Sequence, residues 1–208
     1  TYSKNCEGGA IYNNGTIYIG SNAIFHNNTV KSNGDGGILG GAICNLGSGS
    51  RKAEIEIDSN VQFTNNSAIG YNAKGGAIYN ASNYYSRVIT IKDGAVFLNN
   101  KASLAGGAIY NGNNLNLIAK TYNIEFTGNK ANGVSNAIHD YNGTINLWAS
   151  SNADIIFNDR ITSENVSSKL NINSSTTTLT ANGKIILNED MRSFIGEVYL
   201  YGGELKLE

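Results

Sequence analysis

A six-residue motif, GGAIYN, returns at a nearly constant interval along the chain, and no other feature constrains the fold as strongly. Successive copies begin 29 to 35 residues apart. The copies are GGAIYN at Gly8–Asn13, GGAICN at Gly40–Asn45, GGAIYN at Gly75–Asn80 and Gly106–Asn111, and a degenerate SNAIHD at Ser135–Asp140. A repeat of this length is one supersecondary unit that buries its apolar face on its neighbours, so the motif predicts an elongated stack of such units.

A second motif, Phe-x-x-Asn, recurs in phase with the first. Its copies are Phe25–Asn28, Phe63–Asn66, Phe97–Asn100 and Phe126–Asn129. A fifth phenylalanine, Phe157, has Arg160 where the pattern requires asparagine. Because a stack of repeats has one continuous core, the two motifs predict a single elongated domain without an internal boundary.

Alternating apolar residues predict three short strands in each repeat. The first is the Ala-Ile-Tyr of the motif, the second contains pairs such as Ile55 and Ile57, and the third ends at the phenylalanine, as in Val61 and Phe63. Residues between them are often polar, as burial with a period of two requires. Three strands and three turns in about thirty residues predict a right-handed parallel β-helix. We expect about six to seven coils, roughly 30 Å long at a strand spacing of about 4.8 Å.

The pattern changes after Phe157. Residues 1–164 carry the GGAIYN and Phe-x-x-Asn repeats, and residues 165–208 contain shorter alternating segments. These segments predict about two further coils of the same β-helix, built differently. The sequence starts and stops inside patterned sequence, so we expect a piece of a longer protein.

The small residues of the two motifs have predicted structural roles. Two glycines permit a sharp corner with positive φ and a close approach of neighbouring coils. Asparagine tolerates left-handed conformations, and stacked asparagine side chains form amide ladders at corners. A polar ligand groove is the alternative interpretation of these rows. Cys6 and Cys44 occupy different positions of their repeats, too far apart for a disulfide, so we expect free, mostly buried thiols.

Composition bears on the class of partner. The net charge is −1 and only 15% of residues are charged, so nothing in the charge predicts binding to nucleic acid or to an anionic membrane. No run of about eighteen apolar residues predicts a membrane-spanning helix, and no direct membrane insertion is expected.

Enzyme and metal chemistry would need clusters that the sequence does not show. The 16 acidic residues are scattered, and His26 and His139 lie in different registers without metal-ligand spacing. Asp159 and Arg160 form the one acid–base adjacency near a phenylalanine corner, and we interpret it as a surface pair. We expect no catalytic site, no cofactor and no metal.

The pairing of GGA-Ile with Phe-x-x-Asn resembles the repeat signature of the chlamydial polymorphic membrane proteins and related autotransporter passengers. The four full motif pairs cover residues 8–129, and the segment 193–207 resembles the passenger-associated repeat of such proteins. The resemblance implies a secreted β-helical passenger at the bacterial outer membrane or cell surface. It also implies an outer-membrane β-barrel translocator outside this chain, and commonly an adhesin function.

Two features are candidates for binding. If the isoleucine of GGAIYN points inward, the next residue points outward and gives an exposed column; the alternative is that tyrosine and alanine face inward. The column contains Tyr12, Cys44, Tyr79, Tyr110 and His139. The following turns are long in two successive coils, at 46–53 and 81–87, and binding residues concentrate on such loops. The loops carry Arg51, Lys52, Tyr84, Tyr85 and Arg87, none of which we assign to an inward set. A plain solvated loop is the alternative.

The leading functional hypothesis is a bacterial cell-surface passenger that acts as adhesin or display stalk. Its partner would be a surface protein or glycan of another cell, for which aromatic rows and basic side chains are suited. The alternatives are a structural subunit of a surface layer or extracellular filament and, less favoured, a β-helical polysaccharide-degrading enzyme.

Overall fold

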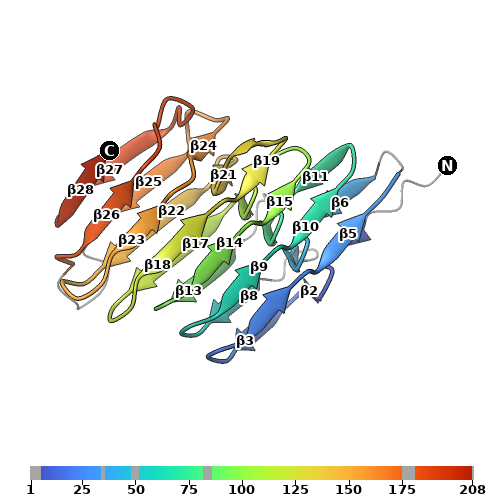
Figure 1. Ribbon diagram of the computed structural model, residues 1–208, viewed down its shortest axis with the longest axis horizontal. Coiled ribbons are helices and arrows are strands. Elements are labelled where there is room, and N and C mark those ends of the chain that lie inside the picture. Colours follow the sequence, from blue (N-terminus) through green and yellow to red (C-terminus); the bar gives the residue numbers. More distant parts are fainter. Residues whose placement is uncertain (1–5, 34–35, 48–51, 82–85, 175–180, 208) are drawn as a thin grey trace.

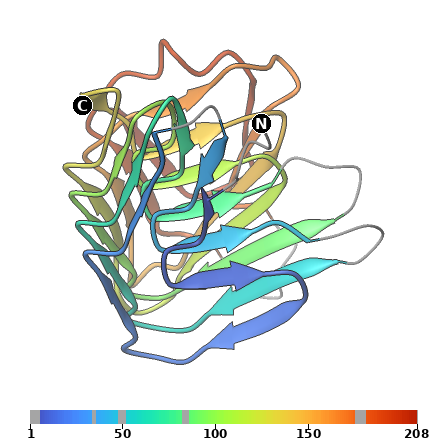
Figure 2. The same cartoon turned by 90° about the vertical axis from the view of Figure 1, so that its right-hand side faces the viewer.

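The computed structural model describes residues 6–33, 36–47, 52–81, 86–174 and 181–207. The regular elements in these ranges are all β-strands, and they form five sheets. Figure 1 shows the strands side by side along the long axis, and Figure 2 shows the coils stacked on one another. Strands of successive coils pair in parallel and in register, as between Ile78 and Ile109. The protein is a parallel β-helix, as the repeats predict.

Three of the sheets contain the predicted strands. Sheet 1, the GGAIYN sheet, contains β2 (Ile11–Asn13), β7 (Ile43–Asn45), β12 (Ile78–Asn80), β16 (Ile109–Asn111), β21 (Ile138–Asp140) and β24 (Ile161–Ser163). Sheet 2 contains β3 (Thr16–Ile19), β8 (Ala53–Ile57), β13 (Arg87–Lys92), β17 (Asn114–Ala119), β22 (Thr144–Ala149), β25 (Lys169–Ile172) and β27 (Glu197–Leu200). Sheet 3, the phenylalanine sheet, contains β4 (Ile24–His26), β9 (Gln62–Thr64), β14 (Val96–Leu98), β18 (Ile124–Thr127), β23 (Ile155–Phe157), β26 (Lys184–Leu187) and β28 (Glu204–Leu207).

Two further sheets were not predicted, so three strands per coil is too few for the first coils. Sheet 4 follows the Phe-x-x-Asn motif and contains β5 (Thr29–Lys31), β10 (Ser67–Ile69), β15 (Lys101–Ala102), β19 (Lys130–Ala131) and β20 (Val134–Ser135). Sheet 5 precedes the GGA and contains β1 (Cys6–Glu7), β6 (Gly37–Leu39) and β11 (Asn72–Lys74). These strands have two or three residues, too few for an alternating pattern to stand out.

The main core lies between sheets 1, 2 and 3. The isoleucines of the GGAIYN motif point into it; Ile11 of the first copy is partly buried, and those of the later copies, such as Ile78, are fully buried. The five motif phenylalanines form one stack with ring centroids 4.5 to 4.8 Å apart. That distance matches the spacing of hydrogen-bonded strands, so each ring packs on the ring one coil away. The isoleucine and phenylalanine columns therefore line the core as predicted.

The two glycines of each GGA motif have separate roles, as the copy at Gly75 and Gly76 shows. Gly75 has φ of 69°, in the left-handed region that favours glycine. Gly76 has no such constraint, but a Cβ placed on it would lie 2.0 Å from the carbonyl oxygen of Gly107 in the next coil. The first glycine turns the corner, and the second lets neighbouring coils approach.

The motif asparagines form two buried amide ladders along the helix axis. The first ladder runs through Asn13, Asn45, Asn80, Asn111 and Asp140, and the second through Asn28, Asn66, Asn100, Asn129 and Asp159. Each Nδ2 donates to a side-chain oxygen of the next coil at 2.6 to 2.9 Å. The ladder interpretation of the asparagine rows is therefore correct, and a ligand groove along them is not formed.

Both ladders end on an aspartate, for a reason of hydrogen-bond chemistry. A carboxylate only accepts, so it receives the last amide without presenting a donor that would need a partner of its own. Asp140 and Asp159 are 0% and 4% exposed, and burial raises the pKa of both carboxyl groups. Interpreting Asp159 and Arg160 as a surface pair was therefore wrong. Asp159 takes the ladder position one residue earlier than the motif spacing requires, and Arg160 contacts Glu189 and Asp190.

The left-handed residue of the Phe-x-x-Asn corner is the one before the ladder asparagine. Asn27, Asn65 and Asn99 have φ of 57°, 56° and 56°, and Gly128 has φ of 72°. The tolerance of asparagine for this conformation is thus used at a different asparagine from the one predicted.

Sheets 4 and 5 enclose a second, smaller core of Val30, Ile38, Ala68 and Ala73. The segment between the two motifs shortens along the chain, from 28–40 to 66–75 and then to 100–106. Sheet 5 accordingly ends at β11, and in a later coil β19 pairs antiparallel with β20. Asn132 and Gly133 join these two strands with φ of 48° and 75°, the signs of a type I′ turn.

Candidate binding surfaces

The tyrosine row points away from the main core, as predicted, but most of it is not exposed. Tyr12 is 46% exposed and Tyr79 is half-buried, whereas Cys44 and Tyr110 are only 0% and 1% exposed. Burial raises the pKa of Tyr79 to about 12 and raises the pKa of the Cys44 thiol. Cys44 is a free, buried thiol, as predicted. The side chain of Cys6 lies outside the described residues.

Sheet 5 covers this row. Glu7 and Lys74 are both register partners of Leu39 in that sheet. The Lys74 amine donates to the Tyr110 hydroxyl at 3.3 Å and lies 4.6 Å from the centroid of its ring. Rings of Tyr79 and Tyr110 stack at 5.2 Å, so the row is an internal packing column. The prediction of an exposed aromatic column is wrong for Tyr110 because Lys74 of sheet 5, a sheet that was not predicted, lies over its ring.

The two long loops are only partly within the described residues. Arg51, Tyr84 and Tyr85 lie outside them. The Lys52 side chain is 74% exposed, with its amine 4.0 Å from a carboxylate oxygen of Glu54. Surface pairs of this kind contribute little to stability, so Lys52 remains available for contact.

Arg87 is not a surface residue, contrary to the prediction. It is 0% exposed, its Nε donates to the Leu46 carbonyl, and its guanidinium lies against Gly47. In sheet 2 it pairs in register with the buried Ala53, so its side chain follows the inward phase of the strand. Arg87 therefore connects the two loop-bearing coils from within.

His139 contacts the coils on both sides, and its ring stacks on that of Tyr110 with centroids 5.5 Å apart. Its Nδ1 lies 2.9 Å from the Thr162 hydroxyl and its Nε2 lies 3.2 Å from a Glu164 oxygen. Burial lowers the pKa of the imidazole, which the charge of Glu164 opposes. Over the described ranges, no group of three or more His, Cys, Asp or Glu residues could hold a metal ion. In the same part of the chain, no helix is long and apolar enough to cross a membrane.

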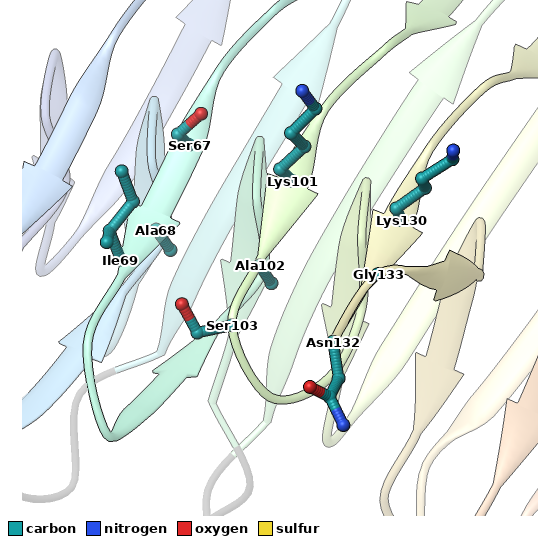
Figure 3. A pocket seen from close by; sticks show the side chains of 9 residues that line it. All are labelled: Ser67, Ala68, Ile69, Lys101, Ala102, Ser103, Lys130, Asn132 and Gly133. Carbon is teal, nitrogen blue, oxygen red and sulfur yellow. The ribbon is translucent and has the colours of Figure 1, made fainter.

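A groove on the outer face of sheet 4 is a candidate that sequence reasoning missed. It has a volume of about 500 Å³ and crosses β10, β15 and β19 (Figure 3). Its lining residues are Ser67, Ala68, Ile69, Lys101, Ala102, Ser103, Lys130, Asn132 and Gly133. Figure 3 shows Ser67, Lys101 and Lys130 along one side and Ile69, Ser103 and Asn132 along the other, with small residues between.

The two lysines are neighbours because of the repeat. Each directly follows a ladder asparagine, so strand pairing puts Lys101 in register with Lys130 and with Ser67. Both side chains are exposed, and none of the groove residues is acidic. The sequence signal was a lysine directly after Phe-x-x-Asn in two successive repeats. It was missed because sheet 4 was not predicted.

Repeated coils, a buried phenylalanine stack and amide ladders define the protein as a repeat β-helix with side chains displayed on a rigid frame. Residues 60–81 and 94–112 match the Chlamydia polymorphic membrane protein repeat. The chain is 31% identical to the probable outer membrane protein pmp1 of Chlamydia pneumoniae over 212 residues, an alignment that covers 92% of this chain. It spans 22% of the length of that relative. No solved structure matches. The chain therefore carries repeats of the chlamydial polymorphic membrane protein type, as the motifs indicated.

Proposed function

We propose that this chain is part of a passenger displayed at the bacterial cell surface, where it acts as an adhesin or display stalk. The similarity to an outer membrane protein over 92% of the chain is the observation that carries the proposal. The partner would be a protein or glycan on another cell. A β-barrel translocator would lie outside this chain.

The architecture supports this function. The buried stacks and ladders make a rigid rod, since every side chain in them packs on its equivalent one coil away. Outward-facing residues and turns are free to vary on such a rod, and binding residues concentrate there. Lys52 and Tyr12 are the exposed members of the predicted contact set within the described residues.

Two measurements test the proposal separately. Antibodies raised against the folded chain should label intact, unpermeabilised bacteria that express the whole protein. Absence of labelling, together with labelling after permeabilisation, would refute display at the surface.

Adhesion is tested with the purified, folded chain coupled to fluorescent beads. We expect saturable binding to epithelial cells, competed by the free chain. The control is beads that carry a Gly76→Arg variant, in which the coils cannot approach closely. This control tests whether binding requires the folded β-helix. Equal binding by both kinds of bead would exclude specific adhesion.

A further inference from the structure

The groove of sheet 4 has the chemistry of an anion site. We propose that it binds the sulfate or carboxylate groups of an acidic glycan, with Lys101 and Lys130 as the anion-binding residues. The inference rests on the surface function proposed above and names the class of ligand. Figure 3 shows the two lysine side chains extending from adjacent strands along the same side of the groove, so both amines are available to neighbouring anionic groups of one ligand.

Electrostatics argues that these lysines are not placed for stability. Like charges directly opposite each other on neighbouring strands destabilise a sheet. Two other places in the fold show how a cation on a strand or turn can be paired: Lys184 is in register with Glu204 and lies 3.4 Å from its carboxylate, and Arg160 contacts two carboxylates. Within the described ranges, neither Lys101 nor Lys130 has an ion-pair partner. A bound anion would supply the missing counter-charge.

The other side of the groove supplies hydrogen-bond donors at fixed positions. The Ser103 hydroxyl oxygen accepts the Gly70 N–H at 3.3 Å, which leaves its O–H to donate. Asn132 is exposed and is held by the tight turn between β19 and β20. Neutral donors opposite two cations suit a ligand that carries both hydroxyl and anionic groups, which is the chemistry of an acidic sugar.

A glycan fits this groove better than an acidic peptide. A peptide usually adds a strand to a free sheet edge, but β10 and β15 are each paired on both sides. A peptide that binds otherwise needs a buried pocket for an anchor side chain, and small residues such as Ala68 and Ala102 make the floor here. An extended, hydroxyl-rich chain that lies on the surface has neither requirement.

The test compares matched charge variants of the folded chain. Lys101→Gln/Lys130→Gln removes both amines from the groove, and Lys120→Gln/Lys169→Gln removes two exposed lysines outside sheet 4, so both variants lose the same net charge. Lys101→Arg/Lys130→Arg keeps the charge. Immobilised dextran sulfate supplies sulfate groups, hyaluronan supplies carboxylates and plain dextran supplies neither. Binding is measured by surface plasmon resonance, and circular dichroism checks the fold of each variant.

We expect binding to one or both charged polymers and not to dextran, with a weaker response at high salt. The groove variant should lose at least about tenfold in affinity, and the outside variant should change by less than about twofold. The arginine variant should bind. Equal loss in both glutamine variants, or no loss in the groove variant, would overturn the assignment. Tighter binding to poly-glutamate than to either charged glycan would reject the ligand class.

The outcome is separable from that of the proposed function. If beads carrying the groove variant still bind cells saturably, the chain is an adhesin that uses another surface. If the chain binds charged glycans through the lysines but does not bind cells, the groove assignment stands and the adhesin proposal fails.

Discussion

Replacing one asparagine in the middle of a ladder measures how much the ladders stabilise the fold. Asn100 is fully buried, and its side chain makes four hydrogen bonds. Its Oδ1 accepts the backbone N–H and the amide of Asn66 at 3.0 and 2.9 Å. Its Nδ2 donates to the Phe63 carbonyl and to the Asn129 amide oxygen, both at 2.9 Å. Asn100→Ala removes all four at once.

The expected loss follows from that count. A net hydrogen bond contributes about 1 kcal/mol, and a buried group left without a partner costs more, so Asn100→Ala should lower the free energy of unfolding by about 4 kcal/mol. Asn28 in the same ladder is a matched control because its side chain donates one bond, to Asn66, and is only half-buried. Asn28→Ala should therefore lose about 1 kcal/mol.

Urea denaturation followed by far-ultraviolet circular dichroism gives both values, provided that the dependence on urea is unchanged between variants. A loss at Asn100 several times that at Asn28 supports the bond count. Equal losses at the two positions would show that asparagine acts there through its turn conformation or its shape, and the ladder argument would be refuted.

Three further changes test other parts of the structure by the same urea assay. Gly76→Ala should lower the free energy of unfolding by about 2 kcal/mol or more, because the new Cβ would collide with the Gly107 carbonyl oxygen. Gly15→Ala has no atom within 4 Å of the new Cβ and should change the free energy of unfolding by less than about 0.5 kcal/mol. Similar losses for the two variants would contradict the role of Gly76 in the close approach of coils. The pKa values of Asp140 and Asp159 are raised above 3.8, so their contribution to stability is complete below that pH and is lost as pH rises through the folded-state values. Acidification from neutral pH should therefore stabilise the wild type relative to the Asp140→Asn/Asp159→Asn variant, and an unchanged difference would show that the carboxylates are not desolvated. Arg87→Ala should lower the free energy of unfolding by about 3 kcal/mol. An unchanged urea midpoint would show that the Arg87 side chain is not buried in the folded protein.

The sequence predicted the sheets whose strands show an alternating pattern. Ile55, Ile57, Ile89 and Ile91 mark sheet 2 over several residues, and their burial is complete or nearly so. Sheets 4 and 5 have strands so short that each contributes one inward residue, such as Ala68 or Ile38 in the second core. One inward residue per strand carries no periodicity, so these sheets can be recognised only by comparing equivalent positions in neighbouring coils.

Two errors at the site had signals that were available. Arg87 precedes Ile89 and Ile91 at the same spacing, and a period of two assigns it to the inward face; its charge led to the opposite assignment. Asn132-Gly133 is the strongest short hairpin signal in a sequence, and it marks the point where β20 turns back on β19. In both cases the local sequence pattern, a period of two at Arg87 and an Asn-Gly pair at 132–133, predicts the structure correctly.

The shortening of the inter-motif segment links the fold to the proposed glycan groove. In the first coil the residue directly after the ladder asparagine is Thr29, in the second it is Ser67, and only in the next two is it a lysine. Sheet 5 has ended in both of those coils, and in the second of them sheet 4 closes with a hairpin. Two adjacent like charges can be held there because the ladder asparagines Asn100 and Asn129 fix the start of each strand from inside. We therefore expect that Asn100→Ala weakens the binding of a charged glycan as well as the fold, whereas Asn80→Ala, in the other ladder, lowers stability with a smaller effect on binding. The affinity of both variants for the charged glycan is compared at a temperature where each remains folded. Equal effects on affinity would show that the ladder beneath the groove does not position the two lysines.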